Sequence, residues 1–192
     1  FNSDAIVEID GNVSVDGITI NTASVWIEGA LGTTYDLTTG YLTVNAGTQI
    51  ILLDANMNIT GAFDHGANNV ELDGGTFLVQ GSVTGSGGLT ILDGILRLGG
   101  SNLLPDTAAI TLNSGVALDL DGYDASIDTL TGGGSVTTGG GTLTVGAGDG
   151  TSSFSGVISG SGGLTKTGSG QFNLANNNTY TGNTTVSQGG LS

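Results

Sequence analysis

Four aspartates are the residues of this sequence best placed to do chemistry: Asp119, Asp121, Asp124 and Asp128. Paired carboxylates serve as acid and base in polysaccharide hydrolases, and the pattern Asp-x-Asp-Gly-x-Asp is similar to part of a calcium-binding loop. The distal bidentate Glu of such a loop is missing, and no basic residue lies nearby in the sequence. We therefore expect Asp119 to point outward from a strand and the other three to occupy a corner. A weak calcium site and a catalytic pair are the two alternatives.

The remaining candidates have the composition of corners. The segment Gly146–Gly150 resembles a calcium-binding nonapeptide, but that motif works by repetition and occurs here once. The glycine runs at 132–134 and 139–141 are followed by no helix and no nearby Lys that would bind phosphate. The single His, His65, is expected at an exposed turn, and it cannot supply a catalytic triad alone. We expect no catalytic, cofactor-binding or metal-binding residue.

Three aromatic residues lie near the start of the sequence: Trp26, Tyr35 and Tyr41. They can form a sugar-stacking surface, but packing in a core or a cap is the favoured interpretation.

Charge and composition exclude several classes of function. The 192 residues carry 17 acidic and two basic side chains, which gives a formal net charge of −15. Two cations cannot neutralise a row of phosphates, so nucleic acids and anionic membrane surfaces are not expected partners. No Cys is present, which excludes disulfides and thiolate chemistry. No apolar stretch reaches the roughly 18 residues of a membrane span.

Short strands are the elements that must position these residues. Apolar residues alternate with Thr, Ser, Asn or Asp in segments such as 5–9, 42–44, 91–98, 110–112 and 143–145. This period of two is typical of a strand with one buried face. Gly, Asn and Asp bound each segment and suit tight corners, whereas no apolar stripe of helical spacing is sustained.

Internal repeats choose among the all-β architectures. Gly85–Thr90 recurs identically as Gly160–Thr165, an offset of 75, and Thr90–Leu96 aligns with Thr185–Leu191, an offset of 95. The difference of 20 is the length of one solenoid turn, and a whole turn is easily inserted because each turn contacts only its neighbours. The sequence therefore predicts a single-stranded, right-handed parallel β-helix with about nine turns, roughly 45 Å long at the usual strand spacing.

One family matches the C-terminal motifs. The segments Gly-Gly-Leu-Thr-Lys-Thr-Gly-Ser-Gly (162–170), Asn-Thr-Tyr-Thr-Gly (178–182) and Thr-Thr-Val-Ser-Gln-Gly-Gly-Leu (184–191) resemble the autotransporter-associated β-strand repeat, also called the passenger-associated transport repeat. The resemblance extends over 81–192 and leaves 1–80 as degenerate turns of one continuous solenoid. It implies a β-helix in a large secreted or surface-exposed bacterial protein. Lys166 occupies the family's Lys position, where we expect a structural role, bonding along a turn or pairing with an Asp.

The sequence thus predicts a non-enzymatic extracellular structural or adhesive segment of a bacterial surface protein. Its expected partners are neighbouring repeats or copies of itself end to end, with surface glycans or other cells as further partners. No cofactor, nucleic acid or membrane insertion is expected. The alternatives are a hydrolase-like or lyase-like β-helix enzyme acting on polysaccharides and a calcium-stabilised binding module.

Overall fold

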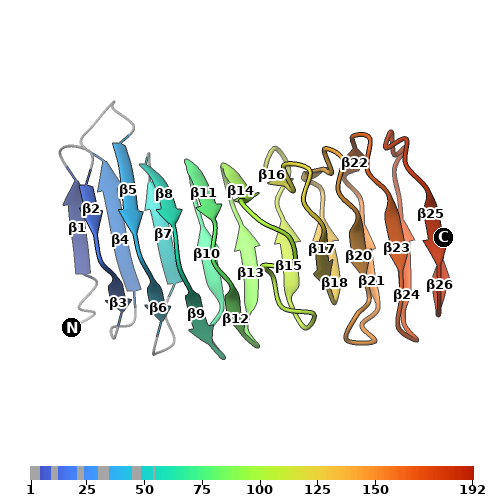
Figure 1. The fold of residues 1–192 in the computed structure, drawn as a ribbon, viewed down its shortest axis with the longest axis horizontal. Helices are drawn as coiled ribbons and strands as arrows, with labels where there is room; N and C mark the ends of the chain where they lie inside the picture. The colour runs from blue at the N-terminus through green and yellow to red at the C-terminus, as the bar shows by residue number, and fades with distance from the viewer. Residues whose placement is uncertain (1–4, 10–12, 21–23, 30–34, 45–48, 54) are drawn as a thin grey trace.

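Parallel strands stacked along one axis form the molecule, with the N-terminus at one end and the C-terminus at the other (Figure 1). The computed structural model describes the chain except residues 1–4, 10–12, 21–23, 30–34, 45–48 and 54. Every pairing between the described strands is parallel, as in Met57 with Phe77 and Leu89 with Ile110. The predicted parallel β-helix is confirmed. The described residues include no helix long and apolar enough to cross a membrane.

Three faces run along the axis, and the chain visits them in order on each turn, with a strand on most visits. The first face holds β1 (Ala5–Ile9), β4 (Ser24–Gly29), β7 (Gln49–Leu53), β10 (Val70–Leu72), β13 (Gly88–Ile91), β15 (Ala109–Leu112), β18 (Thr129–Gly132), β21 (Ser152–Phe154), β24 (Gln171–Leu174) and β26 (Gly190–Leu191). The second face holds β2 (Val13–Val15), β5 (Tyr35–Thr39), β8 (Ala55–Ile59), β11 (Thr76–Val79), β14 (Ile95–Leu98), β16 (Ala117–Asp119), β19 (Ser135–Thr137) and β22 (Val157–Ser159). The third face holds β3 (Ile18–Ile20), β6 (Leu42–Val44), β9 (Phe63–Gly66), β12 (Val83–Gly85), β17 (Ala125–Ile127), β20 (Leu143–Val145), β23 (Leu164–Lys166) and β25 (Thr184–Val186).

The second face is one continuous sheet of eight strands, to which the last turn, from β24 to β26, adds none. The nine turns expected differ only slightly from the number in the stack. The third face is two sheets of four strands. Between β12 and β17 the chain at 102–103 carries the axial bonding instead. The Val83 amide donates to the Leu103 carbonyl at 2.7 Å, and the Asn102 amide donates to the Asp124 carbonyl at 2.7 Å.

The register confirms turns of about 20 residues. Met57 pairs with Phe77 and Leu164 with Thr184, whereas the shortest and longest spacings are those of Ala117 with Ser135 and Ser24 with Gln49. The repeats that suggested this turn length lie on different faces, however. Gly85–Thr90 leads into β13 on the first face, whereas Gly160–Thr165 leads into β23 on the third. Both repeat pairs are displaced by a face in the same sense, so the difference between their offsets still equals one turn. The same sequence of a corner followed by a strand can therefore occupy any of the three faces.

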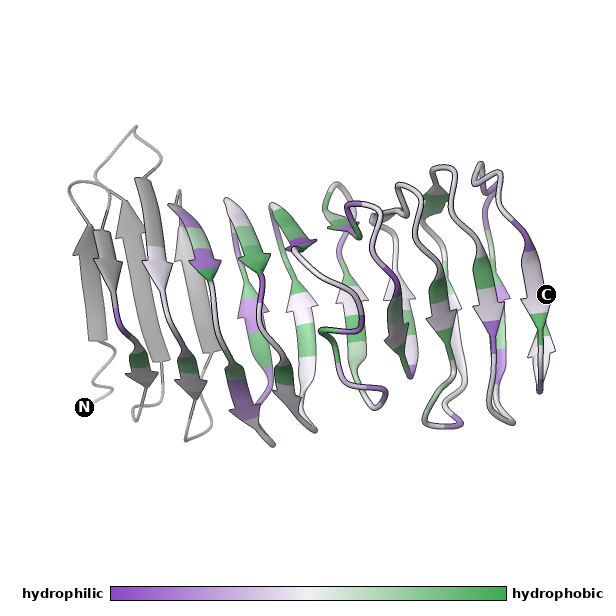
Figure 2. Ribbon diagram, in the orientation of Figure 1, coloured by the Kyte–Doolittle hydropathy of each residue, from purple (hydrophilic) through white to green (hydrophobic). Residues whose placement is uncertain are grey.

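Stacked apolar side chains fill the inside of the coil. Phe77 is 1% exposed and lies between its axial partners Met57 and Leu96, and its ring meets that of Phe63 edge-on at 5.5 Å. Hydrophobic and hydrophilic bands alternate along the strands (Figure 2). Because every second residue of a strand faces inward, each turn adds one layer to a core that continues along the axis.

Successive turns approach closely at the corner between the second and third faces. Gly81 there lies against the backbone of Gly61, and Gly61 lies against that of Gly40. A Cβ added to Gly81 would overlap the carbonyl of Gly61, and one added to Gly61 would overlap the carbonyl of Gly40. Only glycine leaves room for this stacking of backbone on backbone.

Candidate functional site

Two aspartates of the acidic cluster, Asp124 and Asp128, bind backbone amides of the next turn. The Oδ1 atom of Asp128 accepts hydrogen bonds from the Gly148 amide at 3.0 Å and the Gly150 amide at 2.7 Å. The Oδ1 atom of Asp124 accepts one from the Thr142 amide at 2.7 Å. At corners the strand ladder is interrupted, and these carboxylates satisfy amides that would otherwise lack a partner.

The structure separates the four aspartates along the chain. Asp119 points outward from β16, as predicted, and Asp121 and Asp124 are exposed in the corner that follows. Asp128 lies one strand further on, between β17 and β18. Within the described residues, no three His, Cys, Asp or Glu side chains are grouped so as to hold a metal ion. The geometry is that of structural caps between turns.

Asp128→Ala is expected to lower the free energy of unfolding by about 1–3 kcal/mol, because two backbone amides lose a charged acceptor. Denaturant titration at pH 7 measures this change. The matched control is Asp106→Ala, which removes an equal charge from an exposed position and should cost less than about 0.5 kcal/mol. Equal losses in the two variants would contradict the capping role.

Gly146–Gly150 forms the predicted corner, between β20 and β21. Its Asp149 accepts a hydrogen bond at 2.6 Å from the Ser169 amide, one turn further along. That hydrogen bond is the main cause that lowers the pKa of Asp149 below its usual value. The Ser169 side chain and, to a lesser degree, the charge of Lys166 act in the same direction, while burial opposes them. The ionised carboxylate is therefore the form that the folded chain stabilises.

The contribution of Asp149 to stability should disappear in acid. Because its pKa is lower in the folded chain than in the unfolded chain, the contribution is fully present above the unfolded pKa of about 3.9. It is lost as the pH falls below that value and through the folded pKa. We expect Asp149→Asn to be less stable than the parent at pH 7 and to approach it below pH ~3. Urea titrations across this range test the sign, and a gap that widened in acid would contradict it.

His65 is not at an exposed turn, so that expectation is wrong. It lies in β9, is 1% exposed, and its ring meets that of Phe63 at 5.5 Å. Its Nδ1 atom donates to the Asn68 carbonyl at 2.9 Å, since a carbonyl oxygen can only accept. The short strand continues through Asp64-His65-Gly66 and turns this side chain inward, where the ring completes a layer of the core.

Lys166 is fully buried and has the structural role expected of it. Its Nζ atom donates to the carbonyl oxygens of Thr167 and Gly168 in the corner that follows β23, the second at 3.0 Å. Glycines at 146 and 189, on the turns before and after, leave room for the ammonium group. The bonding is therefore along its own turn, at a corner where carbonyls converge.

Of the three aromatic residues near the N-terminus, only Tyr41 has a described side chain, and it does not pack in the core. It is 48% exposed, and its ring covers Gly17 of the preceding turn. The side chains of Trp26 and Tyr35 lie outside the described residues.

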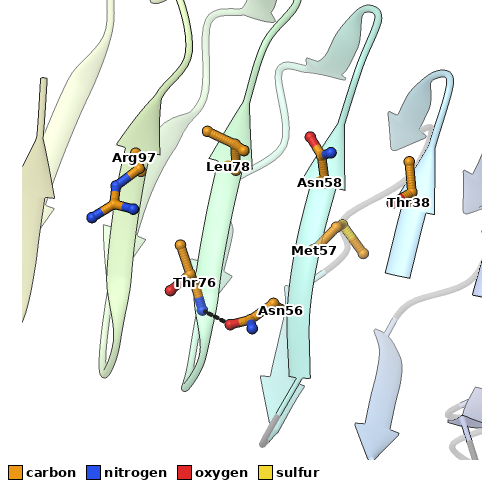
Figure 3. A pocket seen from close by; sticks show the side chains of 7 residues that line it. All are labelled: Thr38, Asn56, Met57, Asn58, Thr76, Leu78 and Arg97. Atoms are coloured by element: carbon orange, nitrogen blue, oxygen red, sulfur yellow. Dashed lines mark hydrogen bonds between the residues drawn. The ribbon is translucent and has the colours of Figure 1, made fainter. Parts of the chain in front are cut away.

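A groove of about 320 Å³ lies over the second face, across β5, β8, β11 and β14. Figure 3 shows the side chains that line it, which are Thr38, Asn56, Met57, Asn58, Thr76, Leu78 and Arg97. The Thr76 amide donates to the Asn56 Oδ1 atom at 2.8 Å along one side (Figure 3). Along the axis, Thr38, Asn58, Leu78 and Arg97 are successive strand partners on four turns. No sequence motif marks this row, but its residues recur in the sequence at a spacing of about one turn.

Arg97 is fixed in place at the end of this row. Its Nε and Nη2 atoms donate to the Asp119 Oδ2 atom at 2.9 and 2.8 Å, across neighbouring turns. Asp119 is held in turn by the Asp121 amide, which donates to its Oδ1 atom at 3.0 Å. A guanidinium has five N–H donors, so the ion pair orients the group and leaves further donors at the rim of the groove.

Asn58 carries a buried acceptor with no partner. Its Oδ1 atom is the one buried side-chain polar atom among the described residues that makes no hydrogen bond. Its axial neighbour Leu78 offers no donor. In a stack of asparagines each amide bonds to the next, and here the stack is replaced by an aliphatic side chain. The groove thus combines a cation, an unused acceptor and an apolar surface.

Comparison with known proteins finds a family model that matches the C-terminal end of the chain and a relative that aligns with nearly all of it. The sequence model of the passenger-associated transport repeat matches residues 164–192. The chain is 34% identical over 195 residues to the "Adhesin BmaC autotransporter" of Brucella suis biovar 1 (strain 1330), which covers 98% of the chain. The chain spans only 5% of that relative's length. No solved structure matches this chain.

Proposed function

We propose, from the premise that this chain carries a passenger-associated transport repeat, that it is a segment of a bacterial surface protein and contributes to adhesion as a stiff β-helical rod. The relative that it resembles is named an adhesin autotransporter. The observation that carries the proposal is the axial stack, in which each turn templates the next from β2 to β22 without interruption. Such a stack presents side chains at regular intervals along a long surface.

The physical properties of the rod suit an extracellular location and a non-enzymatic role. Hydrogen bonds between turns run along the axis and hold successive layers together. The net charge of −15 keeps neighbouring rods apart in solution. Of the carboxylates considered for catalysis, Asp124 and Asp128 cap backbone amides and Asp119 pairs with Arg97. Further repeats, or further copies of the chain, are the partners that we propose along the axis, since an outermost parallel strand offers unpaired backbone groups.

A bead assay tests the adhesive role. Beads coated with the folded chain should attach to cultured animal cells or to bacterial cells in greater number than beads coated with the same mass of heat-unfolded chain. Soluble folded chain should compete with the attachment. Equal attachment by both coatings, or none above uncoated beads, would contradict adhesion by this segment and leave it the role of a spacer.

A further inference from the structure

We propose that the groove over β5, β8, β11 and β14 binds a carboxylate-bearing saccharide, such as a uronic or sialic acid residue of a glycan. This inference rests on the proposed adhesive function and names the ligand class for one surface of the rod. It is carried by three side chains in one axial row: Asn58, Leu78 and Arg97.

The charge of the ligand follows from Arg97. Of the two basic side chains in the sequence, Lys166 is fully buried and Arg97 is 42% exposed. Arg97 is held by Asp119, so it is preorganised to bind a carboxylate with its remaining N–H donors. The surrounding charge of −15 repels polyanions. A ligand with a single carboxylate is repelled less than a polyanion is.

The hydroxyl groups of the ligand follow from Asn58. Its buried Oδ1 atom lacks a hydrogen-bond partner among the described residues, and a saccharide hydroxyl is the donor that such an acceptor requires. Leu78 lies between Asn58 and Arg97 in the row and presents an aliphatic surface to the C–H face of a sugar ring. Two strand spacings, about 10 Å between Cα atoms, separate Asn58 from Arg97 along the row.

A peptide ligand fits the groove less well. Extended peptides usually bind at a sheet edge, where backbone groups are unpaired. The groove lies on the face of a sheet whose strands β8 and β11 are paired on both sides. Only side chains can therefore bind a ligand in the groove. Arg97 and Asn58 favour a ligand with one carboxylate and several hydroxyl groups.

Saturation-transfer NMR with the complete 192-residue chain tests the proposal. The probes are methyl β-glucuronide, the methyl glycoside of N-acetylneuraminic acid, neutral methyl β-glucoside, and N-acetylglutamate methylamide as an acidic peptide. At least one acidic saccharide should bind, more tightly than the glucoside and the peptide, and the stronger of the two identifies the source of the carboxylate. No binding of either acidic saccharide, equal binding of the glucoside, or tighter binding of the peptide would overturn the proposal.

Two variants assign the binding to the groove. Arg97→Gln should weaken acidic-saccharide binding about tenfold, because a charged hydrogen bond is lost. Asn58→Leu should weaken it about threefold to tenfold without lowering the melting temperature, since it removes a buried acceptor that has no partner. Thr137→Val, on the same face beyond Asp119, is the control and should bind as the parent does. Unchanged binding in both groove variants would overturn the assignment.

The bead assay separates this inference from the function beneath it. Attachment of beads without any saccharide binding in solution would overturn the groove proposal and leave the adhesive role intact. Saccharide binding without bead attachment would contradict the adhesive role, and the proposal of a saccharide site in the groove would stand.

Discussion

Phe77→Ala is expected to lower the free energy of unfolding by about 3–5 kcal/mol, the usual cost of emptying a buried aromatic site. Phe77 is 1% exposed, contacts the Phe63 ring edge-on, and lies between Met57 and Leu96 of the adjacent turns. A layered core cannot close the gap, because each layer is held at a fixed spacing by the hydrogen bonds along the axis. Denaturant titration followed by circular dichroism measures the loss.

Phe77→Leu is the matched control for this substitution. It keeps an apolar side chain in the layer, and it should cost roughly 1–1.5 kcal/mol. A loss for Phe77→Ala as small as that for Phe77→Leu would mean that the interior is loosely packed, which contradicts a stacked core.

Gly81→Ala should cost about 3 kcal/mol or more, at or above the upper end of overpacking effects. The added Cβ would overlap the carbonyl of Gly61, a backbone group that cannot move aside as a side chain can. The two turns must separate at this corner, and the strain is passed to Gly61 and Gly40 below it.

The control for the glycine corner is Gly140→Ala. A Cβ at that position comes no closer than 3.9 Å to its nearest neighbour, the Ser161 Oγ atom. This substitution should change stability by less than about 1 kcal/mol, and the restriction of the unfolded chain can make it stabilising. Similar effects of Gly81→Ala and Gly140→Ala would show that turns do not approach each other at the Gly40–Gly61–Gly81 corner.

The fold could be predicted from the sequence because its two requirements are local and repeated. Alternation in Ile95–Leu98 indicates a strand with one buried face, and corners with Gly, Asn or Asp bound such segments. The turn length came from repeats whose offsets differ by 20. Their placement on different faces could not be predicted, because a corner and a strand of the same sequence serve any face of the coil.

The candidate site could not be predicted from local sequence, because it is formed by contacts between residues that are one turn apart. His65 has a polar neighbour on one side and a glycine on the other, which is typical of an exposed turn, but the strand direction there turns its ring inward. The pairing of Arg97 with Asp119 requires the exact register of β14 on β16.

A signal for several of these contacts was present in the sequence. Gly40, Gly61 and Gly81 recur at about one turn, as do Asp128 and Asp149, and Thr38, Asn58 and Leu78. Reading the sequence in rows of 20 residues would have placed each set in a column.

The central claim is that successive turns lie parallel and in register along one axis, and an engineered disulfide tests it most directly. Thr111 and Thr131 are strand partners on the first face, and their Oγ1 atoms are 3.0 Å apart. Neighbouring strands are about 4.8 Å apart, within the Cα separation that a disulfide spans. The chain contains no Cys, so any bond formed in a double variant is unambiguous.

The control pair is Thr111→Cys with Ser126→Cys, which lies on the third face in β17. Its loop is shorter, so chain closure alone would favour it. Oxidation followed by mass spectrometry should give a nearly complete disulfide in Thr111→Cys/Thr131→Cys and little in the control, with the folded circular dichroism spectrum retained. A control that cross-links as readily as the Thr111–Thr131 pair, or a Thr111–Thr131 pair that stays reduced, would contradict the stack of parallel turns.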